Sequence, residues 1–289
     1  MSLTSLLLLL GSACLHVVTH VALKRSNDRA AFVWWMLIWA GVLFSPVVFL
    51  AWRSIPPLGW GLLALSSVFE AGYFVAIALA YKGADLSLVY PLARGTGPTL
   101  LLLWSATALR ERLTLGGMAG VALIAVGLYV INLPRPGAWR EPLRALGKAG
   151  PRWALLAGAC ISFYTAIDKL GVGVVQDPLF YTYLAIWLSL VWLTPWTFWQ
   201  VGWRGMQAEL RSARWSTALA GFTTLAAYAI VLLTMRLGTP AGYAGAVREV
   251  SVVLGAAYGV LVLKEPGAIM RIVGAAVIAA GVVVIGVLG

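Results

Sequence analysis

Residues 100–131 read LLLLWSATALRERLTLGGMAGVALIAVGLYVI, and residues 253–285 repeat the same pattern as VLGAAYGVLVLKEPGAIMRIVGAAVIAAGVVVI. In each stretch an apolar run ends at a basic residue next to a glutamate, and a glycine-containing apolar run follows. The alignment extends upstream without a gap at a constant offset of 154 residues. It pairs Arg94 with Arg248, Glu111 with Glu265, Gly120 with Gly274 and Gly127 with Gly281. The chain therefore contains a duplication.

Apolar runs of membrane-spanning length fill the rest of the chain. Of 289 residues, 61% are hydrophobic and 11% are charged, which is too apolar for a soluble domain. A helical span needs about 20 apolar residues. Ten such runs can be marked, at residues 3–23, 32–52, 58–80, 86–109, 115–133, 153–174, 179–200, 215–235, 242–263 and 268–288. Barrel strands would alternate over about 10 residues, so the sequence predicts an all-α integral membrane protein with ten transmembrane helices.

Five runs precede the longest connection and five follow it. We predict a first five-helix repeat over residues 1–133, a linker loop over 134–152 and a second five-helix repeat over 153–289. Upstream of the quoted stretches, Cys14 and Thr19 match Cys160 and Thr165 at an offset of 146 residues. Because five is odd, the second copy enters the membrane in the opposite sense. Such inverted repeats are typical of secondary transporters, whose substrate site lies near mid-membrane between the halves.

The two repeated stretches resemble the signature that ends each half of the drug/metabolite transporter superfamily, EamA type. The resemblance covers essentially the whole chain and implies a secondary carrier of amino acids, nucleotide sugars or other metabolites. The substrate does not follow from the fold. A narrower resemblance, in HVVTHVALKRSNDRAAF at residues 16–32 and DLSLVYPLARGTGP at residues 85–98, is to a subgroup associated with phosphonate utilisation. It adds aminophosphonates to the candidate substrates.

Two arginines lie inside predicted spans, where a charge costs about 2.5–3.5 kcal/mol on insertion scales and usually faces the bundle interior. Arg94 lies roughly 10 Å deep in the fourth span, and Arg248 occupies the matching position in the ninth. Inverted repeats would bring both to one central cavity. Their guanidinium groups match a carboxylate or phosphate. The alternative is structural: each arginine pairs with a membrane acid, Glu70 or Glu249, and fixes the bundle.

Acidic and tyrosine side chains complete the predicted substrate site. Glu70 shares a helix face with Tyr73, and Asp168 shares one with Tyr164. Glu70 and Asp168 are candidates to hold a substrate ammonium or a coupling proton. As alternatives, Glu70 is a structural partner of an arginine, and Asp168 is a boundary charge. The full predicted set is Arg94, Arg248, Glu70, Tyr73, Tyr90, Tyr164, Asp168, Tyr228 and Glu249.

Other polar residues favour structural interpretations. His16 and His20 lie one turn apart, but no intramembrane set of Cys, His and carboxylate completes a metal site, so packing or a polar lining is expected for both. Glu111 and Glu265 belong to the repeated signature, and adjacent basic residues are expected to pair with them. The sequence also lacks a nucleophile–base set and a phosphate-binding loop. We therefore expect no enzyme activity, no cofactor and no metal.

The distribution of basic residues predicts a membrane orientation. Of the 21 Lys and Arg residues, 14 lie in odd-numbered connections and 5 in even-numbered ones. By the positive-inside rule the odd connections are cytoplasmic and both termini lie outside. This is opposite to the orientation that the family resemblance implies. We predict a multi-pass protein of a bacterial inner membrane.

Together these features predict a secondary-active, alternating-access transporter of a small anionic or zwitterionic metabolite, of the amino acid or aminophosphonate type. Its expected partners are the substrate, membrane lipids and a coupling proton or counter-substrate, with no nucleic acid. Both a monomer and a homodimer fit. A lipid or lipid-headgroup flippase is an alternative, in which the arginines bind phosphate. An accessory membrane subunit without transport of its own is another.

Overall fold

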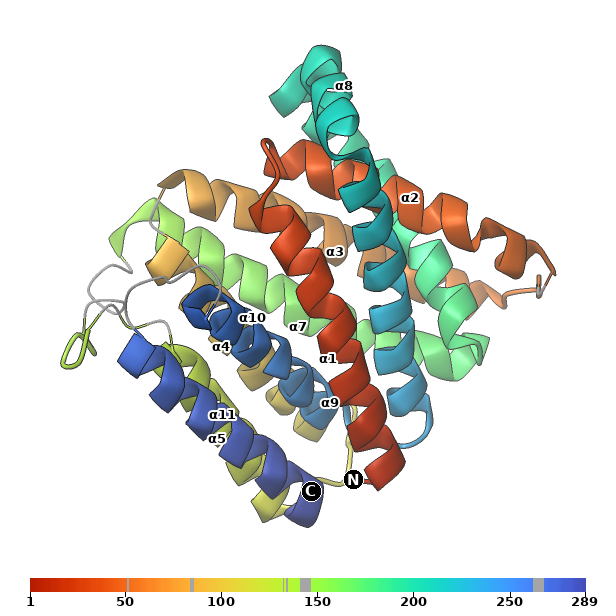
Figure 1. Ribbon diagram of the computed structural model, residues 1–289. Helices are drawn as coiled ribbons and strands as arrows, with labels where there is room; N and C mark the ends of the chain where they lie inside the picture. Colours follow the sequence, from red (N-terminus) through yellow and green to blue (C-terminus); the bar gives the residue numbers. More distant parts are fainter. Residues whose placement is uncertain (51, 84–85, 132, 134, 141–146, 262–267) are drawn as a thin grey trace.

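The fold is a single helical bundle whose two chain ends lie together (Figure 1). The computed structural model describes residues 1–289 except 51, 84–85, 132, 134, 141–146 and 262–267, and it leaves the helical side chains of 24, 81–83, 86–91, 259–261 and 268 undescribed. Over the described residues all regular structure is helical. The helices are α1 (Leu3–Lys24), α2 (Arg29–Leu50), α3 (Pro57–Gly83), α4 (Leu86–Thr107), α5 (Leu115–Ile131), α7 (Ala149–Val175), α8 (Pro178–Arg236), α9 (Ala241–Arg248), α10 (Val250–Leu261) and α11 (Ala268–Leu288).

The helix α8 contains two of the predicted spans. Its backbone leaves helical geometry at Gly202, where φ is 69°, and at Ala213, where φ is −128°. The arms on either side match the predicted runs 179–200 and 215–235. A positive φ strains residues that carry a side chain but not glycine, so Gly202 permits the chain to change direction between the two arms. The sixth span also differs, because α7 begins at Ala149, inside the region predicted as linker.

The predicted ninth span is broken in its middle. The helix α9 ends at Arg248, and α10 begins at Val250. Glu249, between them, donates its N–H to the Ala246 carbonyl at 3.0 Å and accepts from the Val252 N–H at 2.9 Å. Both bonds span three residues instead of the four of an α-helix. The break therefore lies at the two charged residues of this span, a feature typical of transporter binding sites.

The outer surface of the bundle is apolar. Six helices of the described chain are long and apolar enough to cross a membrane, and α8 is one of them. Large hydrophobic side chains face outward, such as Trp199 at 78% exposure and Ile269 at 68%. An apolar surface of this extent requires a lipid environment. The chain is a multi-pass membrane protein.

The repeated glycines pack α5 against α11, which lie side by side in Figure 1. A Cβ added to Gly120 would lie 2.7 Å from the Gly281 carbonyl oxygen, and one added to Gly281 would lie 2.7 Å from the Gly120 oxygen. A Cβ on Gly127 would lie 2.9 Å from the Gly274 oxygen, and one on Gly274 would lie 2.4 Å from the Ile131 backbone nitrogen of α5. Gly120 corresponds to Gly274, and Gly127 to Gly281. The two contacts are therefore equivalent, as an inverted repeat requires.

We expect Gly120→Ala to lower the free energy of unfolding by about 1–3 kcal/mol, because the new methyl group overpacks a backbone contact. Gly11→Ala in α1 is the matched control, since no atom lies within 4 Å of its added Cβ. The control should be neutral or slightly stabilising, because alanine favours helix over glycine. Thermal unfolding in detergent measures both. Equal effects of the two substitutions would contradict this account of the α5–α11 contact.

The bundle has two ends, the α1–α2 face and the terminal face. The α1–α2 face is the end at residues 25–28, where α1 passes into α2, and it also carries residues 200–202 of α8. The terminal face carries Met1, Gly289 and the connection from α8 to α9 at residues 237–240. The Met1 amino group there donates to the Gly289 carbonyl.

Candidate functional site

The first of the two arginines is held by the opposite half of the chain. Arg94, on α4, donates its Nη1 to both carboxylate oxygens of Glu249, at 3.1 and 3.2 Å. Its Nη2 lies 2.7 Å from Nε2 of His20 on α1. Arg94 and Glu249 are 5% and 1% exposed. Of the two acids that the structural alternative named, Arg94 pairs with Glu249 and not with Glu70, so the ion pair joins the first repeat to the second.

The second arginine lacks such a partner. Arg248 is 6% exposed, and its Nε is buried without a hydrogen bond among the described residues. Its guanidinium carbon lies 6.0 Å from the centre of the Tyr228 ring. The alternative that Arg248 pairs with Glu249 is wrong, because Glu249 is turned toward Arg94. Adjacent residues point about 100° apart on a helix, which allows this divergence.

Asp168 lies at the centre of a set of hydroxyl donors. The Tyr181 hydroxyl donates to its Oδ1 at 2.9 Å, and the Ser66 hydroxyl donates to the same oxygen at 2.5 Å. The Tyr228 hydroxyl donates to Oδ2. Asp168 is 1% exposed, so it is not a boundary charge. Because Tyr228 also faces Arg248, this tyrosine connects the carboxylate to the unpaired arginine.

Glu70 is the second acid of the bundle interior. Its Oε2 accepts from the Ser189 hydroxyl of α8 at 2.5 Å. Among the described residues neither Glu70 nor Asp168 has a cation within ion-pair distance. Both acids therefore retain their charge-pairing capacity for a ligand or a proton.

The tyrosines form a row between these groups. The rings of Tyr73 and Tyr164 are 6.4 Å apart, and those of Tyr164 and Tyr228 are 6.1 Å apart, each pair edge to face. Such contacts are favourable for aromatic rings. Tyr90 belongs to α4, but its side chain lies outside the described residues. The row leads from Tyr73 to Arg248.

A cavity of about 460 Å³ reaches this row from the α1–α2 face. Its inner wall includes His20, Arg94 and Tyr73, and exposed Asn27 and Arg29 lie at its mouth. Arg248 does not line it, and lies beyond Tyr164 and Tyr228. A cavity of this size accommodates a small metabolite.

Several cavity residues did not stand out in the sequence. Trp196 and Gln200 line the cavity from the arm of α8 that precedes Gly202. His20 was expected to pack or to line a polar region, and it contacts Arg94 and lines the cavity. Its position inside a predicted span was the available signal. Among the described residues no group of three or more His, Cys, Asp or Glu is placed to hold a metal ion.

Comparison with known proteins identifies the family of this chain. The model of the EamA-like transporter family matches residues 3–133 and 148–287. The spermidine export protein MdtI of Salmonella arizonae is 38% identical over 74 residues, and that of Citrobacter koseri is 36% identical over 74 residues. Each match covers 26% of this chain and spans 66% of the relative's length. A solved crystal structure, 17% identical, superposes with a TM-score of 0.67 over 98% of this chain and 96% of its own, which shows a shared fold.

Proposed function

The chain belongs to the EamA-like transporter family, and from this premise we propose that it carries a small zwitterionic or anionic metabolite by alternating access. The observation that carries the proposal is Arg248, a buried guanidinium whose Nε has no hydrogen-bond partner among the described residues. A buried charge without a partner is strongly destabilising. An anionic ligand group would compensate it, with a bidentate geometry that arginine favours.

The charges of the site favour a single acid group on the ligand. Glu249 neutralises Arg94, whereas Arg248 is a buried positive charge for which the described residues show no ion pair. A carboxylate carries one negative charge, whereas a phosphonate carries up to two. Asp168 and Glu70 provide negative charge for an ammonium group. This arrangement supports an amino acid type of substrate over an aminophosphonate.

The cavity gives the path of entry. In this structure a ligand enters at the α1–α2 face and meets Arg94, His20 and Tyr73. Movement past the tyrosine row would bring its acid group to Arg248, and rocking of the two repeats would expose the site to the terminal face. If the odd-numbered connections are cytoplasmic, as the loop charges predict, the present cavity faces the cytoplasm of a bacterial cell. Asp168 and Glu70 are the proposed sites of a coupling proton.

A ligand panel on the purified protein tests this proposal. We expect small amino acids at 100 times their Kd to stabilise the protein by about 2.7 kcal/mol, seen as a rise in Tm. At the same concentration acetate and 2-aminoethylphosphonate should give smaller Tm shifts, because acetate lacks the ammonium group and the phosphonate carries excess negative charge. Thermal unfolding in detergent measures the series. A larger shift with 2-aminoethylphosphonate than with any amino acid would reject the single-charge site.

A polyamine is the second candidate substrate. The matched relatives are named spermidine export proteins. In this chain Glu70 and Asp168 accept hydrogen bonds from hydroxyl groups, and neither is neutralised by a described cation. A polyamine with two or more ammonium groups would complement both acids. Stabilisation by spermidine alone in the same panel, lost in Glu70→Gln, would favour this candidate over the zwitterion.

A further inference from the structure

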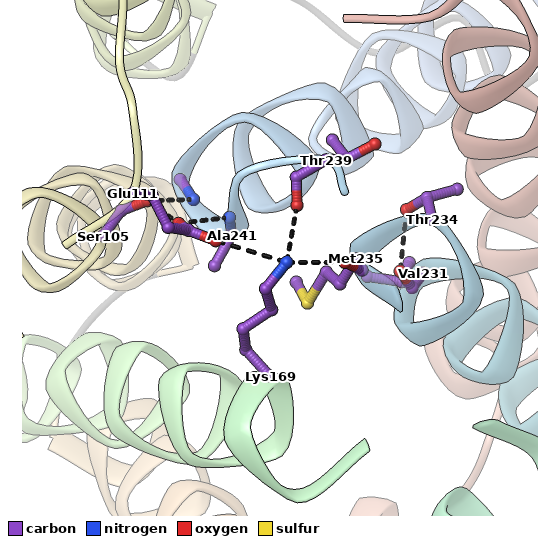
Figure 2. Close-up of polar contacts among 9 residues, drawn as sticks. Ser105, Glu111, Lys169, Val231, Thr234, Met235, Thr239 and Ala241 are labelled. Atoms are coloured by element: carbon purple, nitrogen blue, oxygen red, sulfur yellow. Dashed lines mark hydrogen bonds and ion pairs between the residues drawn. The ribbon is translucent and has the colours of Figure 1, made fainter. Parts of the chain in front are cut away.

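A cluster of polar contacts joins four helices near the terminal face (Figure 2). The Lys169 ammonium on α7 lies 3.3 Å from the Glu111 carboxylate and donates to the carbonyl oxygens of Met235, at 2.5 Å, and Thr239, at 3.0 Å. Met235 belongs to the last turn of α8, and Thr239 lies between α8 and α9. Lys169 therefore neutralises the carbonyl end of one helix and a carboxylate from the first repeat.

Glu111 makes the complementary contacts with α9. Its Oε2 accepts from the Ala241 N–H at 2.8 Å and from the Ser105 hydroxyl. The Ser105 oxygen in turn accepts from the Gly242 N–H at 3.3 Å. A carboxylate is stabilised by the free N–H groups at a helix N-terminus. We call Lys169, Glu111 and Ser105 the latch. Its ion pair differs from the expected pairing of Glu111 with the adjacent Arg112.

The latch connects the two repeats where the bundle is closed. Ser105 and Glu111 belong to the first repeat, and all the groups that they contact across the latch belong to the second. A hollow of about 250 Å³ lies at the terminal face, lined in part by Thr239, and neither Lys169, Glu111 nor the central arginines line it. The 460 Å³ cavity opens at the opposite face. The latch thus lies between the terminal face and the interior.

We propose that the latch is the gate of the terminal face, intact when the cavity opens at the α1–α2 face and broken when it opens at the terminal face. This rests on the alternating access proposed above. The side chains of Lys169 and Glu111 are 19% and 12% exposed, compared with 6% and 1% for Arg94 and Glu249. Water at the partly exposed pair lowers the cost of separating its charges. The latch is therefore suited to opening in each cycle, whereas the buried pair is suited to holding.

Cysteine accessibility in membrane vesicles tests the gate without any substrate. The background is Cys14→Ser with Cys160→Ala, and two single reporters are used. Thr165→Cys lies one turn from Lys169, is buried, and replaces a hydroxyl without a hydrogen-bond partner among the described residues. Asn27→Cys lies at the mouth of the open cavity. A membrane-impermeant maleimide is added at the terminal face for the first reporter and at the α1–α2 face for the second.

We expect Lys169→Met or Glu111→Gln to raise the labelling rate of Thr165→Cys at least tenfold and to lower that of Asn27→Cys. Lys169→Arg should keep both labelling rates close to those of the parent, because it keeps the positive charge at the helix end. The charge swap Lys169→Glu with Glu111→Lys should not keep them, because it places a carboxylate against carbonyl groups and an ammonium against N–H groups. Arg112→Met, which removes a positive charge at the hollow outside the latch, is the control and should leave both rates unchanged.

Two results would overturn the gate. Unchanged labelling of Thr165→Cys in both latch variants would show that closure does not depend on the latch. Faster labelling of both reporters would show a general loosening, and the latch would then be a structural contact. Because no ligand is used, neither result bears on the substrate proposed for Arg248.

Discussion

Arg248→Gln is expected to reduce transport and ligand-induced stabilisation strongly while the ligand-free protein stays as stable as the parent or becomes more stable. The guanidinium is buried and its Nε has no hydrogen-bond partner among the described residues, so the substitution breaks no described hydrogen bond or ion pair and removes a buried charge. Hydrogen bonds to charged groups contribute about 1.5–3 kcal/mol. Since 1.4 kcal/mol corresponds to a factor of ten, ligand affinity should fall at least about tenfold.

Three measurements separate this expectation from a structural role of Arg248. Thermal unfolding without ligand reports stability, the same experiment with the amino acid panel reports binding, and uptake into proteoliposomes reports transport. Arg248→Lys is the matched variant, because it keeps the charge without the planar fork of donors. It should bind more weakly than the parent and more tightly than Arg248→Gln. Parent-like transport by Arg248→Gln would remove this residue from the site.

The sequence predicted the architecture because that depends on periodic features. Membrane-length apolar runs and the duplicated glycines are sufficient for a two-repeat helical bundle. The α5–α11 contact follows from the same glycines. The two arms of α8 match two separately predicted spans, whereas the break at Glu249 was not predicted. That break depends on local backbone geometry in a segment whose composition is that of a continuous helix.

The site was predicted less completely, because it depends on how helices from the two repeats are rotated against each other. The repeat places Arg94 and Arg248 at matching depths, but it does not specify the direction in which each side chain points. The partner of Arg94 proved to be Glu249 from the other repeat. The corresponding position in the first repeat is Gly95, which has no side chain to bind Arg248. One substitution between the copies thus makes two equivalent arginines chemically different.

The contacts of Asp168 also could not be predicted from the sequence. Its three hydroxyl donors come from α3 and from both arms of α8. Periodicity places Asp168 on one face of α7, but the identity of the facing residues depends on packing between segments up to 102 residues apart in sequence. Asp168 lies inside the bundle, as the predicted substrate site requires, and its role as an ammonium or proton site stays a prediction. Its immediate environment required the structure.

Arg94→Met, in contrast to Arg248→Gln, is expected to reduce the free energy of unfolding by about 3–5 kcal/mol. Removal of one partner from a buried ion pair leaves the other charge uncompensated in the interior, and here that charge is Glu249 at 1% exposure. The double variant Arg94→Met with Glu249→Gln removes both charges and should recover much of the lost stability. Equilibrium unfolding of the parent, both single variants and the double variant forms the required cycle.

A surface pair provides the control for this cycle. Arg53 and Asp177 are 3.6 Å apart, and their side chains are 60% and 21% exposed. Exposed pairs contribute about 0–1 kcal/mol, so Arg53→Met should change stability by no more than that. If Arg94→Met were no more destabilising than Arg53→Met, the buried pair would not hold the repeats together. Substitution of either repeat-related arginine would then leave stability nearly unchanged. The proposed division, in which Arg94 has a structural role and Arg248 binds the ligand, would be wrong.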